Sequence, residues 1–453
     1  MPRALLSILL LISTACGTTP SAEPAPTTST STTSTSTTSL VATTSTTASS
    51  SVQPSSTVAQ DFVVSTGSTV LVESDFAHID GKRIGLIAHQ VSVVYGEHLG
   101  DLLHRAPNVE LVAMFGPEHG VRGDADAGEY VEDAIDPATG VPVYSLFGPT
   151  RQPTPEMLAG IDVLLYDLQD VGTRYYTYIS TMGLAMQAAA EAGVEFVVLD
   201  RPNPLGGTVD GGMLDTSYES FVGLYPIADV YGLTAGELAT WVQAELLSSL
   251  ETLDLTVIEM DGWTRSMRWE DTGLEWVAPS PAITTPNAAL LYPTTIYFEA
   301  LSLSYGRGTS RPFQVIGAPW LDPVALIADL ESRGLDGIGF VETTITPAML
   351  RDMTVEPAYL GETIPAVDLI VTNNATLRPA SVGVHVLDAV FAQARNAGVD
   401  PLARPEWLDQ LSGSELLRRS LTDNPLSVEE LLASQAADRE LHDSTRDAFV
   451  IYG

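Results

Sequence analysis

Cysteine and lysine are almost absent from this chain of 453 residues, which contains one of each, Cys16 and Lys82. Because the cysteine lies near the start, the rest of the chain has no disulfide, no thiolate metal site and no cysteine nucleophile. Cations as a whole are scarce: 21 Lys and Arg stand against 57 Asp and Glu, for a formal net charge of -36 at pH 7. Binding to nucleic acid or to an anionic membrane surface depends on clusters of cations, so the composition argues against both.

Motifs that bind cofactors or metals are also missing. No G-x-G-x-x-G sequence follows the first predicted strand, and no Walker A motif occurs. The seven histidines form no His-x-His or His-Glu-x-x-His pair, and no Gly-x-Ser-x-Gly elbow is present. We therefore expect no nucleotide, no other cofactor and no metal, and the sequence argues against a metallohydrolase or a serine hydrolase.

The first residues have the features of an export signal. Arg3 is followed by an apolar run at residues 4–12 that is too short to span a bilayer, and small residues precede Cys16. We expect a signal peptide at residues 1–15. Cys16 resembles the acylated cysteine of bacterial lipoproteins, although Ser13 stands where leucine is usual. The expected location is the cell envelope, as a lipoprotein, with plain secretion as the alternative. Residues 16–62 are rich in Ser and Thr and predict a flexible tether.

The chain as a whole has 45% hydrophobic residues, and the part after residue 62 is long enough to bury a large core. Short apolar runs at residues 83–88, 109–115, 162–167, 196–200 and 255–260 alternate with helical patterns at 181–192 and 234–247. Continuous apolar strands separated by helices predict a parallel sheet that is covered on both faces. We expect a Rossmann-like domain at residues 63–277, and therefore an α/β fold.

A Pro-rich stretch at residues 279–293 then leads into mixed elements. We expect strands at 337–344 and 366–372 and a helix at 384–397. This pattern predicts a smaller α+β C-terminal domain at residues 278–453.

Polar residues follow the predicted strands at the edge of the sheet where ligands bind in open parallel α/β folds. The second strand runs into Glu118 and His119, within a turn of glycine and proline. A carboxyl group in a partly desolvated pocket suits a general acid, so Glu118 is the first choice for that role. The alternative is a carboxylate that caps a helix. His119 fits a positioning role as well as direct chemistry.

The third and fourth strands supply further candidates. Asp167 and Asp170 offer a second carboxylate, although one of them more readily braces Arg174 or a backbone turn. Arg174 offers a fork for an anion, and three tyrosines offer flat faces for sugar rings, with core packing as the alternative for each. The remaining candidates for substrate contact at these strand ends are Tyr175, Tyr176, Tyr178, Asp200, Arg201 and Asn203.

A Gly-Arg-Gly turn forms a separate group. Arg307 and Arg311 lie close together in a chain with few cations, and Glu299 lies upstream. Two arginines there indicate a contact with an anion such as a carboxylate. Pairing with the chain's own acidic residues is the equal alternative.

These motifs resemble those of the NamZ-like exo-β-N-acetylmuramidases, glycoside hydrolase family 171. The likeness runs from about residue 81 to the end and keeps the family's motif order, in segments 116–120, 167–178, 199–204, 220–223, 306–309, 312–313 and 317–320. The resemblance implies removal of terminal N-acetylmuramic acid from the non-reducing end of peptidoglycan fragments. It also implies an active site in the cleft between the two domains, with Glu118 as the catalytic acid.

The chain departs from the family pattern at Val230, Tyr231, Ala282 and Ala300. Two hypotheses therefore stand. In the first, the protein is an exported glycosidase. Glu118 then protonates the leaving oxygen, the second carboxylate is Asp170 or Glu299, and the lactyl carboxylate is held by an arginine from 174, 307 or 311. In the second, the protein is a lipoprotein that binds muramyl sugars without cleaving them.

Overall fold

The structure is a computed structural model, and it describes residues 63–453 except 124, 126–127, 247, 351–355 and 424–425. The predicted signal peptide, the tether and the lipidation site at Cys16 lie outside the described residues. Among the helices of the described part, none is both long and apolar enough to cross a membrane.

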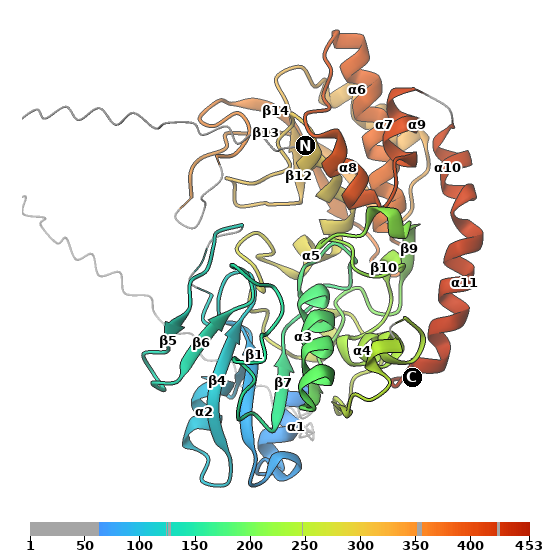
Figure 1. The fold of residues 1–453 in the computed structure, drawn as a ribbon. Coiled ribbons are helices and arrows are strands. Elements are labelled where there is room, and N and C mark those ends of the chain that lie inside the picture. Colours follow the sequence, from blue (N-terminus) through green and yellow to red (C-terminus); the bar gives the residue numbers. More distant parts are fainter. Residues whose placement is uncertain (1–62, 124, 126–127, 247, 351–355, 424–425) are drawn as a thin grey trace, which may run out of the picture. The chain divides into compact units, whose positions relative to one another are not determined.

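A seven-stranded sheet organises the N-terminal part of the body (Figure 1). Its order is β11 (Leu255–Ile258), β8 (Glu195–Leu199), β7 (Val163–Asp167), β1 (Arg83–Ala88), β4 (Glu110–Gly116), β6 (Pro142–Ser145) and β5 (Ala134–Ile135). All neighbouring pairs are parallel except β5 with β6. The predicted Rossmann-like parallel sheet is confirmed, and five of its strands match the apolar runs of the sequence.

Helices cover both faces of this sheet, which explains why the middle of each central strand is continuously apolar, with charged residues only at strand ends. Ile84 and Leu86 in β1 pack with the side of the sheet that α1 (Gly67–Glu73) and α2 (Leu99–Arg105) cover. Ile87, the residue after Leu86, packs in the other cluster, with α3 (Tyr178–Ala192) and α4 (Ala235–Trp241). Alternate side chains of a strand point to opposite faces, so one strand contributes to both layers.

The helices differ from the predicted ranges at their ends. The predicted helix at 181–192 begins earlier, at Tyr178, and ends as predicted before Gly193, which adopts a left-handed conformation (φ 68°). The predicted helix at 234–247 is shorter, because α4 ends at Trp241 and a π-helical turn, η3 (Val242–Leu246), follows. Thr234 caps α4 with a complete capping box.

A smaller unit follows in the chain, built on the antiparallel sheet β12 (Val315–Gly317), β14 (Ile364–Val371) and β13 (Ile338–Ile345). The long helix predicted at 384–397 begins earlier, as α7 (Pro379–Ala397). The other helices here are α5 (Pro286–Thr295), α6 (Pro323–Ser332), α8 (Pro405–Ser412), α9 (Leu416–Thr422) and α10 (Val428–Ser434). The fold is therefore α/β with a smaller second part, as predicted; the position of the boundary between the two parts stays a prediction.

Short elements complete the fold. The hairpins are β2 (Val93–Val94) with β3 (Glu97–His98), and β9 (Val209–Met213) with β10 (Ala228–Tyr231). The 3-10 helices are η1 (Ala77–Ile79), η2 (Thr216–Tyr218), η4 (Ser248–Leu250), η5 (Trp269–Thr272), η6 (Ile296–Ala300) and η7 (Asp447–Phe449).

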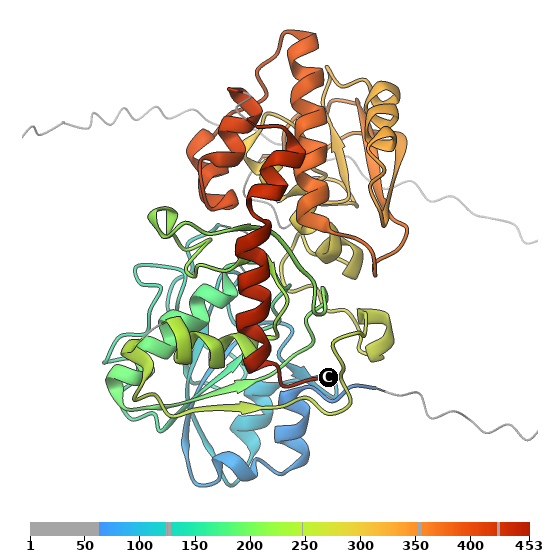
Figure 2. The same ribbon diagram turned by 90° about the vertical axis from the view of Figure 1, so that its right-hand side faces the viewer.

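The end of the chain returns to the N-terminal sheet. Helix α11 (Ala436–Arg446), the long red helix of Figure 2, leads to the C-terminus beside the early elements. Nε2 of His442 lies 3.0 Å from the carbonyl oxygen of Tyr231, and the hydroxyl of Tyr452 donates to Oδ2 of Asp200 at 2.8 Å. These contacts tie the last residues of the chain to Tyr231, at the end of β10, and to Asp200, directly after β8.

Candidate active site

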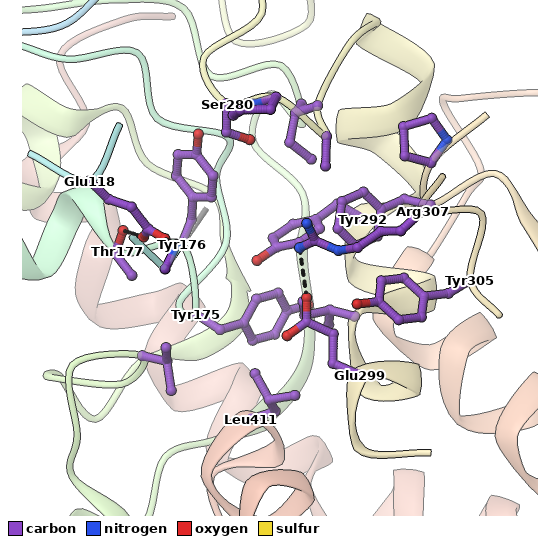
Figure 3. Close-up of a pocket in the computed structure, with 18 of the residues that line it drawn as sticks. Glu118, Tyr175, Tyr176, Thr177, Ser280, Tyr292, Glu299, Tyr305, Arg307 and Leu411 are labelled. Atoms are coloured by element: carbon purple, nitrogen blue, oxygen red, sulfur yellow. Dashed lines mark hydrogen bonds and ion pairs between the residues drawn. The ribbon is translucent and has the colours of Figure 1, made fainter. Parts of the chain in front are cut away.

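A cavity of about 770 Å³ lies beyond the carboxyl ends of the sheet and against the C-terminal unit. Its walls come from distant parts of the chain: the turn after β4, the connection from β7 to α3, the segment 280–284, and segments from α5 to α8. Figure 3 shows Glu118 and Thr177 on one side and Glu299, Arg307 and Tyr305 on the other. The two acidic groups thus face a common space.

Glu118 is held in place by a tight turn. After β4, His119 and Gly120 both adopt positive φ angles, of 76° and 77°. Positive φ costs energy for a residue other than glycine, and such strain often occurs at functional sites. The Oε1 atom of Glu118 accepts a hydrogen bond from the backbone N–H of Gly128 at 3.0 Å, and Oε2 accepts one from the hydroxyl of Thr177 at 3.0 Å. The carboxyl group is therefore fixed at both oxygens.

His119 also lines the cavity, and its side chain is buried. Its Nδ1 lies 3.1 Å from the carbonyl oxygen of Ala125. This contact orients the imidazole ring beside the turn that carries Glu118.

The opposite wall carries a charged pair. The guanidinium of Arg307 donates to Oε1 of Glu299 at 2.9 Å, and the indole N–H of Trp407 donates to Oε2 at 3.4 Å. Burial acts to lower the pKa of Arg307, but Tyr305 and Glu299 outweigh it and raise that pKa overall. Arg307 therefore stays charged and holds the Glu299 carboxylate in one orientation.

Aromatic rings line the space between the two walls. Tyr175 packs edge-on against Tyr292 with ring centroids 5.5 Å apart, and Tyr176 against Tyr178 at 4.8 Å. Burial raises the pKa of each of these tyrosines, so their hydroxyls stay protonated. The Tyr178 hydroxyl donates to the carbonyl oxygens of Glu118, at 3.3 Å, and of Pro279, at 2.9 Å. The Tyr175 hydroxyl is buried without a hydrogen-bond partner among the described residues.

Asp170, a predicted catalytic residue, does not line this cavity. Its Oδ2 accepts hydrogen bonds from the N–H of Gly172, at 2.5 Å, and from the hydroxyl of Tyr231. Burial raises its pKa to about 6, against the opposing effect of these hydrogen bonds. The space beside Asp170, which Arg201 and Asn203 also line, has a volume of about 10 Å³. That is room for roughly one water molecule and excludes a sugar.

The other polar strand ends are also engaged inside the protein, outside the cavity lining. Asp167 and Arg201 form a buried ion pair with Nε and Oδ1 2.6 Å apart. Asp200 accepts hydrogen bonds from the Thr234 hydroxyl at 2.6 Å and from Tyr452. The side-chain amide of Asn203 donates to the carbonyl oxygen of Leu233 at 2.9 Å.

Two of the three arginines proposed from the sequence to bind the substrate's carboxylate have internal partners instead. Arg174 is fully buried and pairs with Asp229, and Arg311 pairs with Asp368. Neither lines the cavity, whereas Arg307 does. Pairing with the chain's own acidic residues, the alternative for the Gly-Arg-Gly turn, describes Arg311 and also Arg307, which pairs with Glu299. The partner of Arg174 is Asp229, in place of Asp167 or Asp170. The structure thus brings together these predicted site residues: Glu118, His119, Tyr175, Tyr176, Tyr178, Glu299 and Arg307.

Sequence reasoning missed several residues of the cavity. Thr177 and Phe221 lie within motifs that carried the family resemblance, but no separate signal marked them. The sequence analysis did not single out Arg151 and Arg404; the one available signal was that cations are scarce in this chain. Of the four departures from the family pattern, Ala282 lines the cavity, while Val230, Tyr231 and Ala300 are buried.

Among the residues that the structure describes, no cluster of three or more acidic, His or Cys side chains could hold a metal ion.

Comparisons with known proteins agree with this fold. The family model described as "Exo-beta-N-acetylmuramidase NamZ, N-terminal" matches residues 84–287, and the corresponding C-terminal model matches residues 290–452. The chain is 40% identical over 398 residues to the peptidoglycan β-N-acetylmuramidase NamZ of Bacillus subtilis (strain 168). That match covers 86% of this chain and 91% of the relative.

Two crystal structures of DUF1343 family proteins from Bacteroides fragilis share the fold. They are 38% and 30% identical in sequence, with TM-scores of 0.79 and 0.69. Each match covers 86% of this chain and 99% of the solved chain. The fold and these relatives define a glycosidase of the α/β class. The chain belongs to the NamZ family of exo-β-N-acetylmuramidases.

Proposed function

We propose that this protein is an exported exo-β-N-acetylmuramidase that removes terminal N-acetylmuramic acid from the non-reducing end of peptidoglycan fragments. Family membership supports a glycosidase that acts on muramyl sugars. The observation that carries the proposal is the pair of carboxyl groups, Glu118 and Glu299, on opposite walls of one cavity. Glycoside hydrolysis commonly needs two such groups on either side of the scissile bond.

In the proposed mechanism, Glu118 donates a proton to the leaving glycosidic oxygen. The hydrogen bonds from Gly128 and Thr177 fix the direction of its carboxyl group. A positioned general acid contributes roughly 10²- to 10⁴-fold to the rate. The tyrosines that line the cavity offer flat apolar faces to the sugar ring.

Glu299 is the second carboxylate in this mechanism. It lines the cavity, and Arg307 and Trp407 hold both of its oxygens. Asp170, the other candidate from the sequence, does not line the cavity. Glu299 would then stabilise or attack the positively charged sugar centre that forms as the bond breaks.

Release of the chromophore from a chromogenic N-acetylmuramide tests this function. We expect turnover by the wild type and a loss of about 10²-fold or more in kcat for Glu118→Gln, which keeps the shape and removes the acid. Thermal unfolding of both proteins controls for misfolding. Absence of turnover by the wild type, with binding of muramyl sugars in calorimetry, would favour the non-catalytic lipoprotein instead.

We also propose that export leads to a lipid anchor at Cys16. The support is the order of charged, apolar and small residues before the cysteine. In a bacterial host that acylates lipoproteins, the wild type should fractionate with membranes and Cys16→Ser should not. Equal recovery of both proteins from the medium would indicate plain secretion.

A further inference from the structure

Arg151 is an arginine on the cavity wall that has no carboxylate partner among the residues that the structure describes. In a chain with 57 acidic and 21 basic residues, an arginine ordinarily finds an acidic neighbour, as Arg174, Arg307 and Arg311 do. Within the part of the chain that the structure describes, Arg151 has no ion pair and donates no side-chain hydrogen bond. Its donors are therefore available to a ligand in the cavity.

Two phenylalanines hold this guanidinium. The Cζ atom of Arg151 lies 3.9 Å from the ring centroid of Phe221 and 5.0 Å from that of Phe147. Both rings line the cavity as well. The guanidinium thus has apolar contact with both rings, and its N–H groups, which have no hydrogen-bond partner among the described residues, are available to a planar carboxylate. Because the group is held in place beforehand, less side-chain entropy is lost when an anion binds.

Backbone hydrogen bonds connect the segment that carries Arg151 to the wall that carries Glu118. The N–H of Gly128 donates to Glu118, and the N–H of Val131 donates to the carbonyl oxygen of Phe147 at 3.2 Å. Glu118 and Arg151 line the same cavity, and residues 128–131 link the loops that carry them.

The other arginines of the cavity are placed differently. Arg307 is engaged with Glu299. Arg404 lines the cavity and lies over the ring of Trp407 at 4.9 Å, on the wall of Glu299. Arg404 also forms no ion pair within the described residues, so it is the alternative that an experiment must separate.

We propose that Arg151, stacked on Phe221 and Phe147, binds the lactyl carboxylate of the terminal muramic acid and so selects N-acetylmuramides over N-acetylglucosaminides. The lactyl carboxylate is the group that distinguishes the two sugars. This inference rests on the proposed function, because it concerns the substrate of the same site.

The test compares chromogenic N-acetylmuramide, its methyl ester and chromogenic N-acetylglucosaminide. The wild type should prefer the free acid, and Arg151→Gln should lower kcat/KM for that substrate by roughly 10- to 100-fold, the range for loss of a charged hydrogen bond. The two substrates without a carboxylate should change by less than about 3-fold, because they make no charged contact with Arg151.

Phe221→Leu, which keeps the charge and removes an aromatic ring beside the guanidinium, should give an intermediate loss. Arg105→Gln removes an exposed arginine outside the cavity lining and is the matched control.

Two outcomes would overturn the inference while the proposed function stands. One is an Arg151→Gln enzyme that keeps the wild-type preference for the free acid. The other is loss of that preference in Arg404→Gln alone. If the wild type cleaves none of the substrates, the proposed function fails, and calorimetry with N-acetylmuramic acid and N-acetylglucosamine still decides the role of Arg151. Tighter binding of the muramic acid by the wild type but not by Arg151→Gln would support the role, and equal binding of both sugars by the wild type would refute it.

Discussion

The hydroxyl of Thr177 donates a hydrogen bond to Oε2 of Glu118 at 3.0 Å (Figure 3). Thr177 stands at the N-cap of α3, where a threonine ordinarily bonds to its own helix, but its side chain makes no capping hydrogen bond. The hydroxyl thus serves the carboxyl group in the cavity instead of the helix. This arrangement makes Thr177 a positioning residue for the proposed acid.

Removing that hydroxyl should impair catalysis more than stability. Thr177→Val keeps the branched shape, and we expect kcat to fall by roughly 10- to 100-fold, as for loss of a hydrogen bond to a charged group. Thr177→Ser keeps the hydroxyl and should stay within a few-fold of the wild type. Steady-state kinetics and the midpoint of thermal unfolding check this. Equal activity of the valine and serine variants would contradict the role.

The activities of variants at Glu299 and Asp170 identify which of the two residues is the second catalytic carboxylate. We expect Glu299→Gln to lower kcat by about 10²-fold or more, because its carboxylate faces the proposed reaction centre. Asp170→Asn should stay within about 3-fold of the wild type, since Asp170 does not line the cavity. Kinetics with the chromogenic muramide measure both. A stable Asp170→Asn protein with no turnover would restore Asp170 as the second carboxylate.

Two buried carboxyl groups should make stability depend on pH. Burial raises the pKa of Asp170 and of Asp200 to about 6, above the unfolded value of about 3.9. The folded state then binds more protons than the unfolded state between about pH 4 and pH 6, so their contribution is complete below pH 4 and is lost as the pH rises to about 6. Each group accounts for up to about 3 kcal/mol of the free energy of unfolding.

Urea unfolding at several pH values measures this effect. Asp170→Asn cannot ionise, so the wild type should lose stability relative to the variant between about pH 4 and pH 6, with a constant difference above that range. Asp200→Asn should behave in the same way. A difference that does not change with pH would show that the group's pKa is the same in the folded and unfolded states.

Arg174 should act as a structural residue. Its guanidinium is fully buried against Asp229, which also accepts a hydrogen bond from the Tyr297 hydroxyl at 2.7 Å. We expect Arg174→Met to lower the free energy of unfolding by about 3–5 kcal/mol, because it leaves Asp229 buried without its partner. Arg419→Gln, at an exposed ion pair, should cost less than about 1 kcal/mol.

A double variant separates this role from substrate binding. Arg174→Met with Asp229→Asn should lose less stability than the two single changes added together, since no uncompensated charge remains. Equilibrium unfolding gives the three free energies. The sequence-based hypothesis that Arg174 holds the substrate's carboxylate predicts instead a raised KM for the muramide with normal stability.

Local patterns in the sequence were sufficient to predict most of the strands of the large sheet and the helices that cover it. The run that follows Arg83, at residues 84–88, is apolar without interruption because β1 contributes side chains to both covered faces. The helix predicted at 181–192 ended correctly because Gly193 supplies the left-handed residue that stops α3. The helix predicted at 234–247 was too long, because no local signal marks the π-helical turn after Trp241.

The same reasoning was less reliable for the site. Chain order alone places Glu118, Asp170 and Arg201 after strands of one sheet. Each has a definite polar contact, but only Glu118 lines the cavity. Whether such a residue meets the cavity depends on what covers it, and residues 233–235 close the space beside Asp170 to about 10 Å³. Tyr231 supplies the hydroxyl that bonds Asp170, from a strand that the sequence did not indicate.

The sequence by itself determined the α/β class, the family, the shortage of cations and the turn that presents Glu118, because each depends on neighbouring residues or on composition. Tertiary structure decided which polar side chains reach the substrate. Arg174 and Arg311 are engaged by Asp229 and Asp368, while Arg151 has no such partner among the described residues. These partners come from distant segments of the chain, and a charge is available for binding only where folding leaves it without one.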